Sequence, residues 1–273
     1  MRLFCIKSKC RGKTIAFVPT MGYLHEGHFS LVEAARKKAD VVVVSIFVNP
    51  LQFGPHEDFN RYPRDLSRDK KLLKELDVDV LFLPEATELY PSRFRTYVEV
   101  EGLSQKLCGR SRPTHFRGVT TVLSKLFNIV TADYAFFGEK DYQQLLIVKQ
   151  MARDLDFPLE IIPLPTVREF DGLAMSSRNK YLAPRERKQA SGLYRALNFA
   201  KKEIQGGERN TNKLLLRLRS RLGTIPGLRL DYIAITDPET LEPMKKIRGK
   251  ALIAVAAYLG KTRLIDNLVV DSK

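Results

Sequence analysis

Two histidines three residues apart are the first feature of the sequence that could do chemistry. His25 and His28 lie in "FVPTMGYLHEGHFSLVEAARKKAD", with Glu26 and Gly27 between them. Apolar residues up to Pro19 predict a strand, and the pattern after it predicts a helix that begins close to His28. The first turn of a helix favours anions, and imidazoles there can donate to phosphate oxygens as charge builds up in a transition state. A metal pair or two surface histidines are the alternatives, but the glycine before the second histidine favours phosphate binding.

Two further clusters carry groups that suit phosphates. In "FFGEKDYQQ", Lys140 and Asp141 come directly after an apolar run, at the end of a strand where parallel sheets bind ligands. A solvated lysine and a helix-capping aspartate are the alternatives there. In "AMSSRNKYL", two serines and Arg178 could clamp phosphates, because a guanidinium donates two parallel hydrogen bonds. An ordinary polar turn would explain this second cluster equally well.

A fourth cluster, "FVNPLQFGPHEDFNRYPRD", lies at the end of the most apolar run of the chain. Asn49 and Gln52 are placed where side-chain amides could bind a substrate, although Asn-Pro is also a common turn. His56 and His115 have no adjacent partner in the sequence, so we expect them to be surface or packed histidines.

The elements that must position these clusters follow an alternating pattern. Apolar runs predict strands at residues 13–19, 40–48, 78–84, 133–138 and 159–165. Helical patterns lie between them, at residues 29–39, 62–76, 119–130 and 141–155. The β-branched run at 40–48 is typical of a strand that is buried on both faces of a sheet. Together these elements predict an α/β fold with a Rossmann-like, doubly wound parallel sheet.

The pattern changes after about Val167. Two helical stretches, 183–204 and 211–222, precede strand-like runs at 228–237, 251–260 and 262–270. Helices followed by strands predict a smaller α+β domain. We therefore expect residues 1–168 to form a Rossmann-like domain and residues 169–273 to form a C-terminal domain that carries the "MSSRN" loop.

Composition excludes several classes of protein. The chain has 273 residues, of which 44% are apolar and 28% are charged, so packed soluble domains are expected. Its longest apolar run is too short to span a membrane, and its start does not resemble a signal peptide. Cys5, Cys10 and Cys108 form no Cys-x-x-Cys motif, which fits a reducing compartment. We expect a cytoplasmic protein without a membrane partner.

The formal net charge of +15 suggests either a nucleic acid partner or a pocket for an anionic substrate. Basic residues are densest at 185–221, where interleaved leucines indicate a helix with one buried side and one solvated basic side. RNA-binding aromatic motifs and zinc fingers are lacking, so we expect no nucleic acid partner.

The four clusters together resemble one family. "PTMGYLHEGH", "FVNPLQFGPHEDFNRYPRD", "HFRGVTTVLSKLFNIVTADYAFFGEKDYQQL" and "AMSSRNKYL" are similar, in this order, to the pantothenate synthetase (pantoate–β-alanine ligase) family. That family belongs to the nucleotidyltransferase superfamily, which includes the class I aminoacyl-tRNA synthetases. "HEGH" matches its His-x-Gly-His signature, and "MSSRN" fills the place of its mobile Lys-Met-Ser-Lys-Ser loop. The resemblance implies that ATP and (R)-pantoate form pantoyl adenylate, from which β-alanine displaces AMP to give pantothenate.

The resemblance also assigns roles to residues. It implies that Lys140 reaches a phosphate, that Asp141 lies near the ribose, and that Val167 touches adenine. The catalytic residues would be His28, His25, Lys140 and Arg178. The implied ATP site consists of Met21, Gly22, Tyr23, Leu24, His25, Glu26, Gly27, His28, Gly138, Glu139, Lys140, Asp141, Val167, Met175, Ser176, Ser177 and Arg178.

The same resemblance implies the other ligands. Gln52 and Gln144 would bind pantoate, and Gln52 would also lie near β-alanine. Asp69 matches a family carboxylate near Mg²⁺, whereas Arg68 stands where some relatives have a second acidic residue. The family is usually a homodimer. A nucleotidyltransferase that makes a dinucleotide is the alternative that His-x-Gly-His alone would permit.

Overall fold

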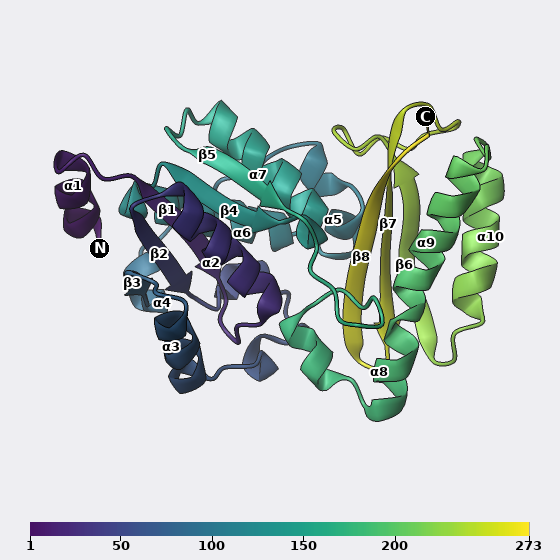
Figure 1. Ribbon diagram of the computed structural model, residues 1–273, viewed down its shortest axis with the longest axis horizontal. Helices are drawn as coiled ribbons and strands as arrows, with labels where there is room; N and C mark the ends of the chain where they lie inside the picture. The colour runs from purple at the N-terminus through teal and green to yellow at the C-terminus, as the bar shows by residue number, and fades with distance from the viewer. Residues whose placement is uncertain (273) are drawn as a thin grey trace. The chain divides into compact units, whose positions relative to one another are not determined.

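The structure, a computed structural model, describes residues 1–272 and divides into two compact units (Figure 1). The first unit consists of Met1–Gln105, Arg112–Glu139 and Gln144–Pro165. The second takes in two short earlier segments, Lys106–Ser111 and Lys140–Gln143, together with the chain from Thr166 onward. The functional division into residues 1–168 and 169–273 stays a prediction.

A five-stranded parallel sheet forms the centre of the first unit. Its order is β3-β2-β1-β4-β5, and all paired strands run in the same direction. Four consecutive valines of β2 are buried, which confirms the expectation that this strand is covered on both faces. The strands are β1 (Ile15–Thr20), β2 (Val41–Ile46), β3 (Val80–Phe82), β4 (Tyr134–Gly138) and β5 (Glu160–Leu164).

Helices cover both faces of this sheet. On one face, α2 (Glu26–Lys38) and α3 (Leu66–Glu75) share a core with alternate residues of β1 and β2. On the other face, Phe17 of β1 packs edge-on against Phe127 of α6 (His115–Val130), with ring centroids 6.4 Å apart. Helix α7 (Tyr142–Asp154) contacts α6 through a hydrogen bond from the Ser124 hydroxyl to Met151 Sδ. The predicted doubly wound α/β fold is therefore confirmed.

This winding decides where a ligand can bind. Strands β1 and β4 are neighbours in the sheet, yet the helices that follow them cover opposite faces. In such sheets a crevice opens at the carboxyl ends of the strands where the winding reverses. The loops after β1, β2 and β4 all leave this edge of the sheet, and the first unit also contains α1 (Arg2–Cys10) and α4 (Ala86–Leu89).

The second unit combines a three-stranded antiparallel sheet with helices. Strands β6 (Leu228–Thr236), β7 (Lys250–Leu259) and β8 (Thr262–Asp271) pair in this order. One apolar core joins them to α9 (Gly192–Gln205) and α10 (Thr211–Gly223). The expected α+β organisation is confirmed. The short helix α5 (Cys108–Ser111) also belongs to this unit.

The helical stretch expected at 183–204 is two helices rather than one. Helix α8 (Pro184–Ala190) ends before Ser191, and α9 begins after it. The Ser191 hydroxyl donates to the backbone carbonyl of Lys188 and accepts from the Arg195 guanidinium. A serine that hydrogen-bonds to nearby backbone in this way competes with the regular helix ladder.

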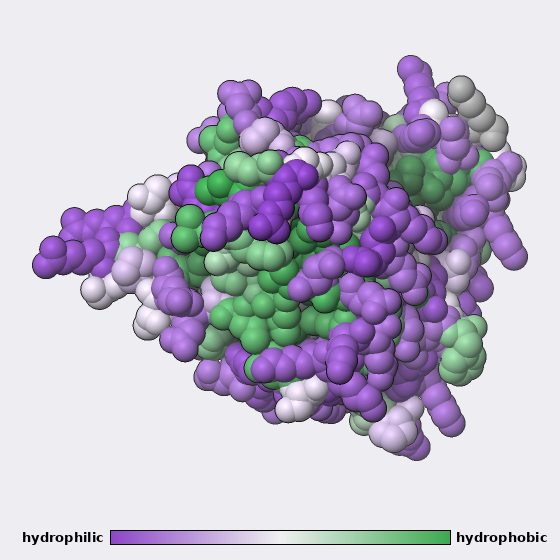
Figure 2. All heavy atoms as spheres, turned by 60° about the vertical axis from the view of Figure 1, so that its left-hand side comes forward, coloured by the Kyte–Doolittle hydropathy of each residue, from purple (hydrophilic) through white to green (hydrophobic). Residues whose placement is uncertain are grey.

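The surface of the first unit carries several exposed apolar side chains. On α1, Leu3, Phe4 and Ile6 are 74%, 43% and 43% exposed. Figure 2 shows apolar atoms gathered in the middle of the face that it presents, bordered by polar ones. A contiguous exposed apolar area is a common mark of protein–protein contact.

Helix α6 presses directly on the loop that follows β2. A Cβ atom on Gly118 would lie 2.3 Å from the carbonyl oxygen of Leu51 and 2.6 Å from the amide nitrogen of Gln52. The amide of Asn49 closes this contact by donating to the Gly118 carbonyl at 3.0 Å. Only glycine permits this approach, because both obstacles are backbone atoms.

We expect Gly118→Ala to lower the free energy of unfolding by about 1–3 kcal/mol, since the helix or the loop must move apart. Gly223→Ala in α10 is the matched control, because no atom lies within 4 Å of its ideal Cβ. Alanine there should be neutral or mildly stabilising, as it is in most helices. Thermal unfolding measures both changes, and equal melting temperatures for the two variants would contradict the close packing.

Candidate active site

The two histidines of the first cluster cap helix α2 together. His25 is the N-cap residue, and its Nδ1 accepts a hydrogen bond from the Gly27 amide at 3.1 Å. Nδ1 of His28 accepts in return from the His25 amide at 3.3 Å. The two rings lie 4.1 Å apart between centroids. The imidazoles therefore satisfy amides of the helix start, a capping role that the sequence analysis did not predict.

This arrangement fixes the tautomer of both rings. A nitrogen that accepts a hydrogen bond carries no proton, so a neutral His25 or His28 must carry its proton on Nε2. Nε2–H is a donor, and it stands beside the positive end of the α2 dipole. Such a pair suits the oxygens of an anionic ligand.

A buried carboxylate holds the loop that leads into the capped helix. Asp69 of α3 is 1% exposed, and its two oxygens accept from the amides of Tyr23 at 2.7 Å and Leu24 at 2.8 Å. Gly22 and Tyr23 both have positive φ angles, +80° and +51°. The carboxylate thus stabilises a left-handed turn that would otherwise be unfavourable at Tyr23.

The same contacts bear on the expected role of Asp69 as a ligand of Mg²⁺. Both of its oxygens are already engaged with backbone amides, and Arg68 Nη1 lies 3.7 Å from one of them. Across residues 1–272, no three His, Cys, Asp or Glu side chains are grouped so that they could hold a metal ion. The residues around Asp69 therefore do not fit a metal site, and its role as a ligand stays a prediction.

A buried relay fixes the amide of Gln52. Oδ1 of Asn49 accepts from the hydroxyl of Tyr90 at 2.8 Å and from the Leu51 amide, so Nδ2 must be the donor of Asn49. That donor reaches Oε1 of Gln52 at 3.1 Å, which leaves the Nε2 of Gln52 to contact Sδ of Met21 at 3.0 Å. The loops after β1 and β2 consequently meet at Met21 and Gln52, both of them predicted site residues.

Asn49 itself is 1% exposed and its amide is engaged by protein groups, so we interpret it as a support for Gln52; binding of substrate by Asn49 stays untested. His115 also differs from a plain surface histidine, because its Nδ1 lies 2.9 Å from the Gln52 carbonyl. Arg112 contacts the same carbonyl at 3.2 Å while it forms a two-pronged pair with Glu57. Tyr90 is mostly buried, and burial raises the pKa of its hydroxyl, which keeps this donor protonated.

The loop after β4 holds the other predicted residues of the first unit. Gly138 ends the strand, and a Cβ there would meet no protein atom within 4 Å. No protein contact therefore requires glycine at this position, which leaves close approach of a ligand as a reason for it. Glu139 follows directly, and the half-buried Gln144 lies in the first turn of α7.

In the second unit, Lys140 and Asp141 form a short 3-10 turn together with Glu139 of the first. The Lys140 ammonium lies 3.4 Å from an oxygen of Asp141, and its side chain is 20% exposed. At this distance the pair is weak and leaves the lysine able to bind another anion.

The serine-rich loop follows a small hairpin. Arg168 and Ala174 form its bridge, and the Met175 amide donates to the Val167 carbonyl at 3.0 Å. Ser176 then caps a 3-10 helix, η5 (Ser177–Tyr181), by accepting from the Arg178 amide at 3.3 Å. Ser177 is buried, and Arg178 is half-buried. The structure thus brings Val167 and Met175 together and places Ser176–Arg178 directly beyond them.

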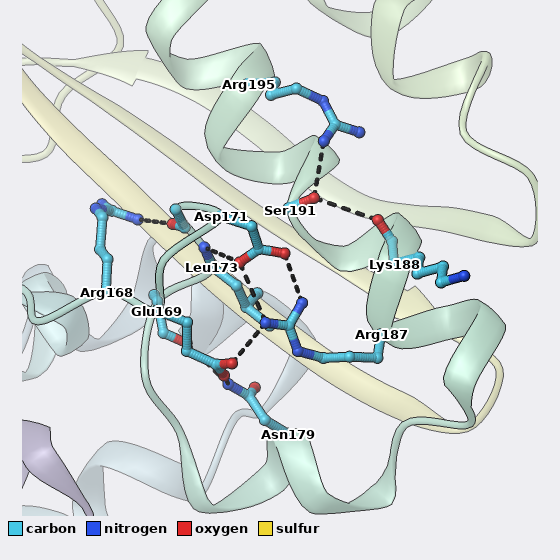
Figure 3. A network of polar contacts seen from close by, with 11 residues as sticks. Arg168, Glu169, Asp171, Leu173, Asn179, Arg187, Lys188, Ser191 and Arg195 are labelled. Atoms are coloured by element: carbon cyan, nitrogen blue, oxygen red, sulfur yellow. Dashed lines mark hydrogen bonds and ion pairs between the residues drawn. The ribbon is translucent and has the colours of Figure 1, made fainter.

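Figure 3 shows the polar network that anchors this hairpin. Arg187 of α8 donates to Glu169 at 2.5 Å and to Asp171 at 2.6 Å. The amide of Asn179 in η5 donates to Glu169 at 2.8 Å and to the Ala174 carbonyl at 3.1 Å. Hydrogen bonds from Arg187 hold the pKa of the Asp171 carboxyl below its usual value and raise the pKa of the guanidinium itself.

Sequence reasoning missed these supporting residues. Arg187 lies in the basic stretch that was interpreted as a solvated helix side, and Tyr90 and Asn179 carried no signal of their own. Their only sequence signal is polarity, which does not distinguish a residue that forms supporting hydrogen bonds inside the protein from one on the surface. A doubly wound parallel sheet, with a histidine-capped helix starting at its carboxyl edge, places the first unit in the Rossmann-like class of α/β folds.

Comparison with known proteins gives the family. The family model described as Pantoate-beta-alanine ligase matches residues 1–269, so the chain belongs to the pantoate–β-alanine ligase family. A pantothenate synthetase of Moorella thermoacetica is 56% identical over 271 residues, 99% of this chain and 96% of that protein. One of Thermotoga neapolitana is 55% identical over 270 residues, again 99% and 96% of the two chains.

Solved structures agree with this assignment. Pantothenate synthetase from Thermus thermophilus has a TM-score of 0.91 at 52% identity, and the match covers 93% of this chain and 92% of that one. A pantoate–β-alanine ligase from Francisella tularensis, complexed with β,γ ATP and β-alanine, has a TM-score of 0.78 at 37% identity. That match covers 97% of this chain and 94% of the other. The expected family and its ligase class are confirmed.

We expect Asp69→Asn to lower the free energy of unfolding by about 1–3 kcal/mol, because an amide NH₂ would face a backbone N–H that now has an acceptor. Glu75→Gln, at the exposed end of the same helix, is the control and should be nearly silent. Both are compared by thermal unfolding in metal-free buffer. A metal ligand predicts the reverse result: an unchanged melting temperature, with a higher Mg²⁺ requirement for activity.

Proposed function

We propose that the chain condenses (R)-pantoate with β-alanine at the expense of ATP, in two steps. First, a carboxylate oxygen of pantoate attacks the α-phosphorus of ATP, and pyrophosphate leaves with the electrons of the broken P–O bond. Then the amine of β-alanine attacks the carbonyl carbon of pantoyl adenylate, loses a proton, and AMP leaves. The product is pantothenate. Membership of the ligase family supports this reaction.

The observation that carries the proposal is the pair of imidazoles at the start of α2. Their Nδ1 atoms are used by the helix, so their protons lie on Nε2 and can be donated to phosphate oxygens. Negative charge moves toward the leaving pyrophosphate as the bond breaks, and a fixed donor is worth most at that moment. We assign His28 as the principal catalytic imidazole, with His25 beside it.

The other residues of the first unit take the following roles. Gln52 and Gln144 bind pantoate, because an amide can both donate to a carboxylate and accept from a hydroxyl. Gln52 also lies near β-alanine, and the Tyr90–Asn49 relay supports its fixed orientation. The ATP-binding residues of this unit are Met21, Gly22, Tyr23, Leu24, His25, Glu26, Gly27, His28, Gly138 and Glu139.

In the second unit, Lys140 and Arg178 act on the phosphates, Asp141 binds the ribose and Val167 contacts adenine. Met175, Ser176 and Ser177 complete the nucleotide-binding residues of this unit. The supporting observations are the weakly paired ammonium of Lys140 and the placement of the serine-rich loop beyond Val167.

The remaining expectations concern the setting of the enzyme. We propose that Mg²⁺ arrives with ATP, since this ion commonly keeps substrate phosphates and water as ligands. No step is assigned to it. The exposed apolar side chains of α1 are consistent with a homodimer. We also propose a cytoplasmic enzyme without a nucleic acid or membrane partner. Among the helices of residues 1–272, none is long and apolar enough to cross a membrane.

The two-step route predicts that labelled pyrophosphate exchanges into ATP when pantoate is present and β-alanine is absent. Adenylate formation is then reversible and does not need the amine. The control omits pantoate, and exchange should stop. Exchange that requires β-alanine would indicate a concerted reaction, and a product that retains AMP would indicate a nucleotidyltransferase.

His28→Ala should lower turnover by about 10²–10⁴-fold, the usual range for one catalytic donor. It should also cost about 1 kcal/mol of stability, because the helix loses part of its cap. His28→Glu separates the two effects, since glutamate at this position can accept from the His25 amide but cannot donate. We expect its melting temperature to recover while its turnover stays low. Near-normal turnover in either variant would remove His28 from the mechanism.

A further inference from the structure

Strand β8 carries two consecutive buried polar residues that the proposed mechanism does not use. Asp266 and Asn267 are 3% and 8% exposed and lie in the middle of the strand. Strand β8 is the edge strand next to β7 in the sheet of the described residues, and it contacts the 3-10 helix η5 that carries Ser177 and Arg178. Both polar residues belong to the second unit, as do Arg168 and Lys140, with which they form hydrogen bonds.

Asp266 holds the base of the hairpin through Arg168. The guanidinium donates from Nη1 and Nη2 to the two carboxylate oxygens at 2.7 and 2.9 Å. It also donates to the Gly172 carbonyl at 3.0 Å and stacks on the Tyr194 ring at 3.9 Å. Arg168 directly follows Val167, so this pair fixes the place of the proposed adenine contact. Burial raises the pKa of Asp266, and the Arg168 guanidinium opposes that change.

Asn267 extends the same network to Lys140. Its backbone amide donates to Oδ1 of Asp266 at 2.8 Å, and its side-chain Nδ2 donates to the Lys140 carbonyl at 2.9 Å. A carbonyl can only accept, so the orientation of the Asn267 amide is determined. The carbonyl belongs to the peptide between Lys140 and Asp141, and its position sets where both side chains begin.

We infer that Arg168, Asp266 and Asn267 form a positioning network that fixes the backbone of Lys140 relative to the hairpin bearing Val167. Through Lys140, this network controls the rate of adenylate formation. This inference rests on the proposed function, which gives Lys140 and Val167 to the nucleotide. A lysine ammonium on a flexible side chain can act on one particular phosphate only if its backbone is fixed. Small displacements of catalytic groups lower the reaction rate strongly. We assign none of the three residues a contact with substrate.

The central test removes the donor to Lys140 and leaves the ion pair intact. We expect Asn267→Ala to slow pantoate-dependent pyrophosphate exchange by about 10- to 100-fold. The KM for pantoate should stay within about twofold. Asn267→Leu keeps the branched shape and the number of side-chain heavy atoms without a donor, so it should behave in the same way if Asn267→Ala folds poorly.

A control substitution in the apolar core of the same strand distinguishes a positioning role of Asn267 from a general effect on stability. Leu264→Ala removes a side chain that is 5% exposed and belongs to the apolar core of this unit, so it should lower the melting temperature. Below its unfolding transition, its exchange rate per folded molecule should match the wild type. The inference would be overturned if the exchange rates of Asn267→Ala, Asn267→Leu and Leu264→Ala all fell in proportion to their losses of melting temperature.

A double-mutant cycle with Lys140→Ala then identifies the route of the effect. If Asn267 acts through Lys140, Asn267→Ala should change the exchange rate less than about threefold on the Lys140→Ala background. If the two substitutions instead reduced the exchange rate independently, so that their fold-changes multiplied in the double variant, the positioning role would be overturned. A wild-type exchange rate in Lys140→Ala would instead refute the proposed role of Lys140, so the two failures are distinguishable.

Discussion

The carboxylate of Asp69 is the contact on which the proposed active site depends most. By accepting the amides of Tyr23 and Leu24, it sets a left-handed turn directly before the N-cap of α2. That turn decides where the helix begins, and therefore where His25 and His28 lie. The interaction is strong because the carboxylate is buried and charge-assisted hydrogen bonds replace its hydration. The two histidines that we propose to be catalytic are thus positioned by a residue on a different helix.

The same principle recurs in both units: a buried polar group orients the group that is proposed to meet substrate. Tyr90 and Asn49 orient Gln52, and Arg187 with Asn179 anchors the hairpin that leads into Ser176. Hydrogen bonds link the members of each relay and restrict the orientation of their side chains, although the buried Oδ1 of Asn179 has no partner among the described residues. Rigid support matters for a reaction whose donors must face charge that appears only in the transition state.

This view also explains part of the basic composition. Arg168, Arg187 and Arg112 each hold a carboxylate with two nitrogens and also contact backbone or a second acidic group. A planar guanidinium suits such two-pronged contacts better than an ammonium does. These arginines therefore form ion pairs within the protein, and their presence is not evidence for a nucleic acid partner.

The sequence by itself determined the parallel α/β fold, the clusters of loop residues and the family, because strand periodicity and contiguous motifs are local properties. It also placed His25 and His28 at the start of a helix and Gln52 after a buried strand, for the same reason. Only the tertiary structure decided that the imidazoles cap their own helix, that Asp69 is occupied by backbone amides, and that Asn49 is buried. The contacts of Asp69 with Leu24 and of Asn49 with Gly118 join residues far apart in sequence, and hydrogen bonds across such distances leave no periodic signal in the chain. The imidazole caps are local, but they depend on the backbone turn before α2, which the distant Asp69 holds.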